Sequence, residues 1–245
     1  MQAAAQTIPK TRALQKMKSH RATPDALDLL EQFGITATVQ RGHEIYGQSE
    51  PTEFCWRIVS GCVRTEKYLE DGRRQVGAFL WSGDLIGMDD LGMHDFGAQA
   101  VTDVTLRRYP RRMVEALAQS HTALAHRLRA LAVGNLRRAY QQMTLLGRRT
   151  ATERIASFLL DLYRRSTSID SRIVDVPMSR MDITDHLGLT IETVCRNLAH
   201  FRRNGIVAIL RSGIELRDPA ALLDSGPITR EPITELGMQL TRLQN

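Results

Sequence analysis

The sequence has few cysteines and aromatic residues, and it has no long apolar run. Cysteine occurs only at Cys55, Cys62 and Cys195, with no Cys-X-X-Cys pair. An odd number of cysteines without that spacing argues against a disulfide framework and favours a reducing, cytoplasmic location. No apolar run approaches the roughly 18 residues of a membrane helix, so no membrane partner is expected.

The sequence also lacks the local motifs of common enzymes. It contains no phosphate-binding glycine loop, no Gly-X-Gly-X-X-Gly dinucleotide motif, no His-Glu-X-X-His zinc motif and no recognisable nucleophile motif. We therefore expect a binding protein and not an enzyme.

Charged residues are plentiful, and positive charge is in excess. The formal net charge is +6, and 42% of the 245 residues are hydrophobic. A basic chain favours polyanionic partners, with nucleic acid first and an anionic membrane surface second. The length allows one large domain or two domains of ordinary size.

The N-terminal half is predicted to be a flexible arm at 1–23 followed by a β-barrel domain at 24–118. In this domain turn signals recur about every ten residues, as in a small antiparallel barrel or sandwich. Asp71-Gly72 predicts a hairpin turn between Val63–Tyr68 and Gln75–Leu80, because glycine tolerates positive φ.

Residues 119–147 are predicted to form one long helix. Leu124, Leu128 and Leu131 follow the four–three spacing of a dimer seam. The same spacing, continued along the helix, falls on polar residues, so the sequence does not predict a regular coiled coil. We expect this helix to dimerise the chain, because a helix between two domains cannot bury all its apolar surface alone. A helix packed wholly on its own barrel is the alternative.

Residues 148–224 are predicted to form a second, smaller domain with a helix-turn-helix. Ser179 can cap a helix that has Asp182 at its third position. Gly188 would end that helix in a left-handed conformation, and Thr190 would cap the next one. Two capped helices joined by a tight glycine turn indicate a DNA-binding motif.

The second helix has two opposed faces. An apolar triplet at helical spacing must face the core; it consists of Val194, Leu198 and Phe201. Glu192, Cys195 and Arg196 lie on the other side and are predicted to read bases. Arginine can donate two hydrogen bonds to guanine, and glutamate can accept one from cytosine. The alternative is an ordinary surface helix with an ion pair between residues one turn apart.

The flanks of the motif are predicted to contact the DNA backbone. Arg180, Thr190 and Thr193 are the candidates. For Arg180 a solvated surface arginine is the alternative. Residues 206–216 predict a β-hairpin wing, and residues 225–245 are a C-terminal tail.

Two segments resemble the CRP/FNR family of bacterial transcription regulators. Residues 83–87 (GDLIG) resemble the family's barrel motif, and residues 182–196 resemble its helix-turn-helix, most closely in the FNR/FixK branch. The resemblance implies an α+β fold: an N-terminal double-stranded β-helix (cupin-like jelly-roll) barrel, a long dimerisation helix and a C-terminal winged helix-turn-helix. It also implies a homodimeric activator that recruits RNA polymerase, often in low-oxygen or nitrogen-fixation programmes. Glu192 and Arg196 would read inverted repeats of the TTGA type.

The sequence departs from the family at both of its usual sensors. Gly97-Ala98 stands where cyclic-AMP binders carry an arginine for the phosphate. The N-terminal arm lacks the cysteine cluster that an iron–sulfur centre requires. We therefore expect no cofactor and no metal. A regulator controlled by an unidentified small molecule or by haem in the barrel is the alternative.

Cys195 is a candidate for redox control. A helix N-terminus and the adjacent Arg196 are both expected to lower the pKa of its thiol, and an exposed thiolate is oxidisable. Oxidation would place a negative or bulky group against DNA. The alternative, that Cys195 is only a small residue facing the groove, stays open.

Overall fold

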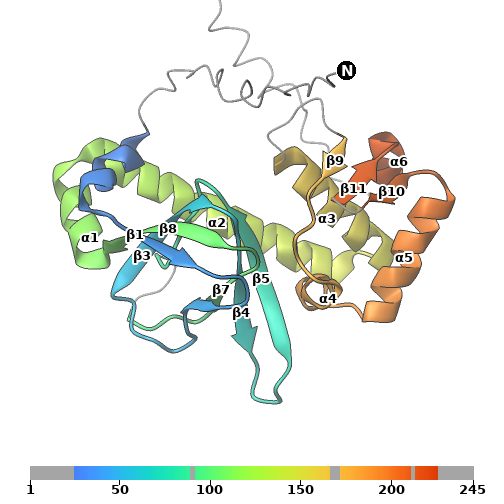
Figure 1. Ribbon diagram of the computed structural model, residues 1–245, viewed down its shortest axis with the longest axis horizontal. Helices are drawn as coiled ribbons and strands as arrows, with labels where there is room; N and C mark the ends of the chain where they lie inside the picture. The colour runs from blue at the N-terminus through green and yellow to red at the C-terminus, as the bar shows by residue number, and fades with distance from the viewer. Residues whose placement is uncertain (1–24, 89–91, 166–171, 211–212, 226–245) are drawn as a thin grey trace, which may run out of the picture.

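The computed structural model describes residues 25–88, 92–165, 172–210 and 213–225. Figure 1 shows a β domain at one end, a C-terminal domain at the other, and the long helix α2 (Thr122–Arg148) running between them. The fold is α+β, with its parts in the predicted order. The predicted arm and almost all of the predicted tail lie outside the described residues.

In its described residues the β domain has a short 3-10 helix, eight strands and a closing α-helix. The first element, η1 (Ala26–Phe33), begins with a capping box formed by Asp25 and Asp28. The elements that follow are β1 (Ile35–Val39), β2 (Glu44–Tyr46), β3 (Phe54–Ser60), β4 (Cys62–Tyr68), β5 (Arg74–Trp81), β6 (Leu85–Ile86), β7 (Gly97–Ala100), β8 (Val104–Pro110) and α1 (Arg111–Ser120). The strands pair in two four-stranded sheets, ordered β1-β8-β3-β6 and β2-β7-β4-β5.

The two sheets enclose an apolar core. Side chains alternate along a strand, so Ile58 of β3 and Leu106 of β8 point inward and are fully buried. Among the described strands no ladder joins the two sheets, so the predicted barrel is a two-sheet sandwich and not a closed ring. The predicted hairpin is confirmed, because Val63 pairs with Leu80 and Gly72 has a φ of 82°.

The first turns of α2 pack on the β domain. Leu124 is 0% exposed in a core cluster that contains Leu30 and Tyr109, and Leu128 and Leu131 pack against the same cluster. Leu124 is therefore buried within its own chain, against η1 and α1, and is not open to a partner. Leu128 and Leu131 are only half-buried, so the dimer seam predicted at them stays a prediction.

A different face of α2 stays exposed. Its large apolar side chains are spaced by three, four and three residues; they are Val133, Leu136, Tyr140 and Met143, which are 60%, 53%, 57% and 65% exposed. We call these four residues the α2 stripe. The three–four spacing is that of a coiled-coil seam, and it lies beyond the part of α2 that the β domain covers.

The C-terminal domain combines four helices with a small sheet. Its elements are α3 (Ala151–Arg165), β9 (Ile173–Val174), α4 (Arg180–Leu187), α5 (Ile191–Arg203), β10 (Val207–Leu210), β11 (Gly213–Leu216) and α6 (Pro219–Asp224). β10 and β11 form the predicted wing hairpin, whose turn at 211–212 lies outside the described residues. The core of this domain extends into the β domain, where it includes Val76 and Phe79 of β5.

His186 of α4 lies where the two domains meet. Its ring centroid is 5.2 Å from that of Phe79 and 5.8 Å from that of Phe158, and its Nδ1 lies 3.1 Å from the Val76 carbonyl oxygen. Burial lowers the pKa of His186, which the hydrogen bond to Val76 and the charge of Asp161 offset only in part. The neutral ring is therefore the form that the domain contact stabilises.

This shift makes the stability of the protein depend on pH. The unfolded histidine has its ordinary pKa near 6.5 and the folded one a lower pKa. The stabilisation is therefore complete above pH 6.5 and is lost as the pH falls toward the folded pKa. We expect the melting temperature to fall between pH 7.5 and 5.5 with a steeper slope in the wild type than in His186→Gln. The exposed His200→Gln is the control and should keep the wild-type slope; equal slopes in all three proteins would contradict this assignment.

Candidate DNA-binding interface

The first helix of the motif, α4, begins with the predicted capping box. The Asp182 backbone N–H donates to Ser179 Oγ at 3.1 Å, and the Ser179 N–H donates to Asp182 Oδ2 at 3.0 Å. Burial alone would raise the pKa of Asp182, but the hydrogen bonds from Ser179 and the charge of Arg64 hold it below its ordinary value. Asp182 is therefore an ionised residue inside the protein.

The turn between the two helices is also as predicted. Gly188 has φ 59° and ψ 46°, a left-handed conformation that glycine adopts without steric cost. Thr190 then caps α5, since its hydroxyl accepts from the Thr193 N–H at 3.2 Å. Arg154 of α3 holds the turn by donating to the Leu187 carbonyl oxygen at 2.9 Å. The angle between α4 and α5 is thus fixed by backbone contacts on both sides of the turn.

The two faces of α5 separate as the sequence predicted. The apolar triplet is buried in the core; it consists of Val194, Leu198 and Phe201. Glu192 and Arg196 are 82% and 67% exposed, and their Oε1 and guanidinium nitrogen lie 3.5 Å apart. Cys195 is exposed beside them. Nothing in the described part of the chain covers this face, so all three side chains are available to a partner.

The predicted backbone-contact residues lie around this face. Arg180 is the first residue of α4 and is half-buried. The hydroxyl oxygens of Thr190 and Thr193 lie 2.9 Å apart, so one hydroxyl donates to the other. The accepting hydroxyl keeps its own O–H, which can donate to a phosphate oxygen. Their roles stay predictions.

Two apolar residues on this surface were missed in the sequence. Ile191 at the start of α5 and Met181 on α4 are 47% and 53% exposed. Apolar side chains in a major groove recognise the methyl group of thymine. Ile191 precedes Val194 by three residues and so continues the spacing of the apolar triplet, but it lies at the start of the helix and stays exposed there, which the spacing alone does not reveal.

The three cysteines differ in accessibility. Cys55 and Cys62 are buried in the β domain, and burial raises the pKa of each thiol to about 12. Cys195 is the exposed one. Because oxidation requires an accessible thiolate, the geometry singles out Cys195 for reaction.

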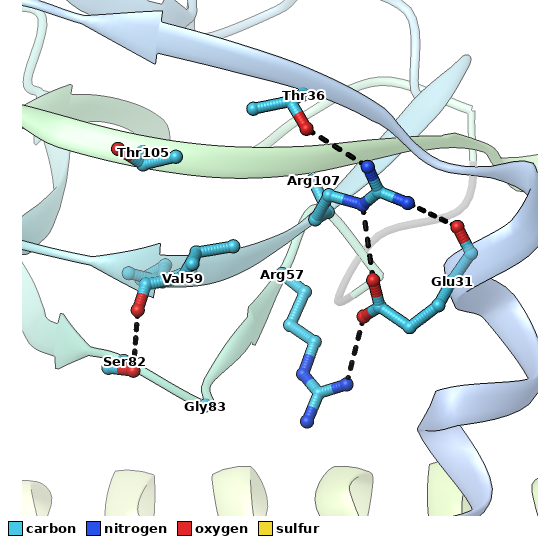
Figure 2. Close-up of a pocket in the computed structure, with 9 residues that line it drawn as sticks. Glu31, Thr36, Arg57, Val59, Ser82, Gly83, Thr105 and Arg107 are labelled. Atoms are coloured by element: carbon cyan, nitrogen blue, oxygen red, sulfur yellow. Dashed lines mark hydrogen bonds and ion pairs between the residues drawn. The ribbon is translucent and has the colours of Figure 1, made fainter. Parts of the chain in front are cut away.

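The β domain has an open pocket of about 490 Å³ on its outer surface (Figure 2). Arg57 of β3 and Arg107 of β8 point toward Glu31 of η1, whose carboxylate oxygens lie 3.1 and 3.2 Å from them. Arg57 also pairs with Asp28 at 3.1 Å, so each arginine has a carboxylate partner within the chain. Gly97 and Ala98 of β7 are buried, and Ala98 belongs to the apolar core between the two sheets. The alternative of a ligand inside the barrel stays a prediction.

Two other kinds of feature, a metal site and a membrane-spanning helix, are absent from the described residues. No group of three or more histidine, cysteine, aspartate or glutamate residues in these parts of the chain is placed to hold a metal ion. Among the helices of the same residues, none has both the length and the apolar character to cross a membrane.

Comparisons with known proteins agree with this geometry. Residues 36–121 match the sequence model of the cyclic nucleotide-binding domain, and residues 153–225 match that of the Crp-like helix-turn-helix domain. The nitrogen fixation regulation protein FixK of Azorhizobium caulinodans is 40% identical over 232 residues, which cover 91% of this chain and 94% of that protein. FixK of Rhizobium meliloti is 38% identical over 189 residues, covering 77% and 85%. The solved structure of FixK2 from Bradyrhizobium japonicum has a TM-score of 0.76 and 39% identity, covering 80% of this chain and 98% of that one.

Proposed function

The chain belongs to the CRP/FNR family of transcription regulators, in its FixK-like branch, and we propose that it binds TTGA-type inverted repeats as a homodimer and there recruits RNA polymerase as an activator. The observation that carries the proposal is the uncovered outer face of α5. Glu192 and Arg196 stand there one helical turn apart, above a buried apolar face that fixes the helix in place.

The chemistry of this face suits base edges in a major groove. Arg196 can donate two hydrogen bonds to guanine O6 and N7, and Glu192 can accept one from cytosine N4. Ile191 adds an apolar surface for the methyl group of thymine. In water an exposed ion pair of this kind contributes only a few tenths of a kcal/mol, so Glu192 and Arg196 separate at small cost when bases are offered.

The homodimer is supported by the α2 stripe. Four large apolar side chains at coiled-coil spacing are exposed on a helix that connects the two domains. Burying such a stripe against its copy removes apolar surface from water and places two α5 helices on one molecule. An inverted repeat presents two equivalent half-sites to a pair of this symmetry.

Base reading is tested by selecting bound sequences from a random DNA pool at a stated salt concentration. Glu192→Ala and Arg196→Ala should each relax the preference at one half-site position by roughly 5- to 150-fold, since a good side-chain–base contact is worth about 1–3 kcal/mol. Arg180→Ala is the contrasting variant: it should weaken binding to all sequences alike and reduce the salt dependence. An unchanged sequence preference in Glu192→Ala would contradict its assigned role.

Dimerisation is tested by placing a charge in the α2 stripe. Leu136→Glu should convert the dimer to a monomer in sedimentation measurements, because the burial of a carboxylate in an apolar seam is costly. It should also lower the affinity for the inverted repeat by at least about a hundredfold, while a single half-site is bound as before. Gln141→Glu adds the same charge on an exposed position outside the stripe. A dimeric Leu136→Glu protein would rule out the stripe as the interface.

Redox control through Cys195 is part of the proposal. Its thiolate attacks one oxygen of hydrogen peroxide, the O–O bond breaks, and a sulfenic acid and hydroxide result. A second peroxide oxidises the sulfenic acid to the negatively charged sulfinate and releases water and a proton. Peroxide should therefore weaken DNA binding by the wild type by about tenfold or more, through charge repulsion at the DNA. Cys195→Ser should bind equally with and without peroxide. Equal loss in both proteins would trace the effect to another residue.

A further inference from the structure

An arginine of the β domain reaches the first helix of the DNA-binding motif. Arg74 lies at the start of β5, and its three guanidinium nitrogens each contact a carboxylate. Its Nε donates to Asp185 of α4 at 2.8 Å, one terminal nitrogen donates to Asp182 at 2.7 Å, and the other donates to Glu66 of β4 at 3.2 Å. A planar guanidinium whose three nitrogens are all engaged in this way fixes its partners in direction as well as in distance.

Asp182 has a double role in this contact. Its Oδ2 closes the capping box with Ser179, whereas its Oδ1 accepts from Arg74 and lies 3.4 Å from the Arg64 guanidinium. The residue that completes the cap of α4 is therefore the residue that the β domain holds. Any rotation of α4 away from β5 would separate Asp182 from both arginines.

The charges involved are shielded from water. Five residues make up what we call the Arg74 cluster: Arg64, Glu66, Arg74, Asp182 and Asp185. Their side chains are between 6% and 20% exposed. Removing one partner from such a cluster leaves the remaining charges unpaired where water cannot solvate them. The cluster therefore favours one arrangement of the two domains strongly over others.

We propose that Arg74 is a positioning residue for DNA binding, which holds α4 in one orientation on the β domain so that the two α5 helices of a dimer meet half-sites at one spacing. This rests on the proposed function. α4 and α5 move together because the glycine turn and Arg154 fix their angle. Since α2 runs from the β domain to the C-terminal domain, an orientation fixed on the β domain is also fixed relative to the partner (Figure 1).

The spacing of half-sites reports this orientation directly. Adding one base pair between half-sites moves the second one by about 3.4 Å and rotates it by about 35° around the duplex axis. A rigidly held pair of reading helices cannot follow that change, whereas a loosely held pair can. A loss of folded protein, in contrast, lowers binding to every spacing by the same factor.

The chain offers a matched control next to Arg74. Arg73 is 77% exposed and pairs with Asp71 in the hairpin turn. We would measure the affinity of full-length wild type, Arg73→Met and Arg74→Met for inverted repeats whose half-sites are constant and whose spacing varies by one or two base pairs. Wild type and Arg73→Met should lose at least about tenfold per base pair away from the optimum.

Arg74→Met should bind the optimal spacing at least about tenfold more weakly and should discriminate spacings by less than about threefold, with its half-site base preference unchanged. Asp185→Asn removes one of the three Arg74 contacts and should flatten the profile less, and adding it to Arg74→Met should change little, because Arg74→Met already removes that contact. A sharp, wild-type-shaped profile in Arg74→Met, or a uniform loss at every spacing, would overturn the proposal.

Hydrogen exchange of the DNA-free protein gives an independent measurement. Arg74→Met should raise exchange in α4 by about tenfold relative to Arg73→Met and leave α1 unchanged. Unchanged exchange in α4 would overturn the positioning role even if DNA binding were altered. A wild type that does not prefer inverted repeats over random DNA would defeat the proposed function instead, and the exchange result would still decide the role of Arg74 in holding α4.

Discussion

The carboxylate of Asp182 accepts hydrogen bonds from two parts of the chain that lie far apart in the sequence. One oxygen completes the cap of α4, and the other receives Arg74 from β5. A charge removed from water is costly unless it is paired and hydrogen-bonded, so the helix start and the domain contact stabilise the same ionised group. The direction of α4, and through the glycine turn that of α5, depends on this shared residue.

The features that could be predicted from the sequence are local ones. Ser179 and Thr190 act on backbone N–H groups within three residues, and Gly188 acts on its own φ, so residue type and spacing are sufficient. The same holds for the two faces of α5 and for the hairpin at Asp71-Gly72, where period and turn chemistry determine the outcome. The α+β fold followed from the order of these local signals together with the family resemblance.

The features that could not be predicted from the sequence depend on which parts of the chain pack against each other in the folded protein. Leu124, Leu128 and Leu131 have the spacing of a buried helix face, but spacing does not say whether a partner chain or the chain's own β domain buries it. Arg74 and Asp182 are 108 residues apart, and no local pattern relates an arginine after a hairpin turn to a helix cap. Both outcomes are set by tertiary packing.

Base reading and helix positioning depend on charged side chains in different environments, one exposed to water and the other shielded from it. Glu192 and Arg196 are exposed to water, which screens their charges. Each can therefore replace its ion-pair partner by another group at a small cost in free energy. The Arg74 cluster is shielded, and there the loss of one partner leaves an unpaired charge. On the proposed function, a substitution on the exposed face alters which bases are preferred and leaves the domain arrangement intact, whereas a substitution in the cluster does the reverse. The half-site sequence and the half-site spacing are thus governed by separate sets of residues, and the second set is shared between the β domain and the DNA-binding domain.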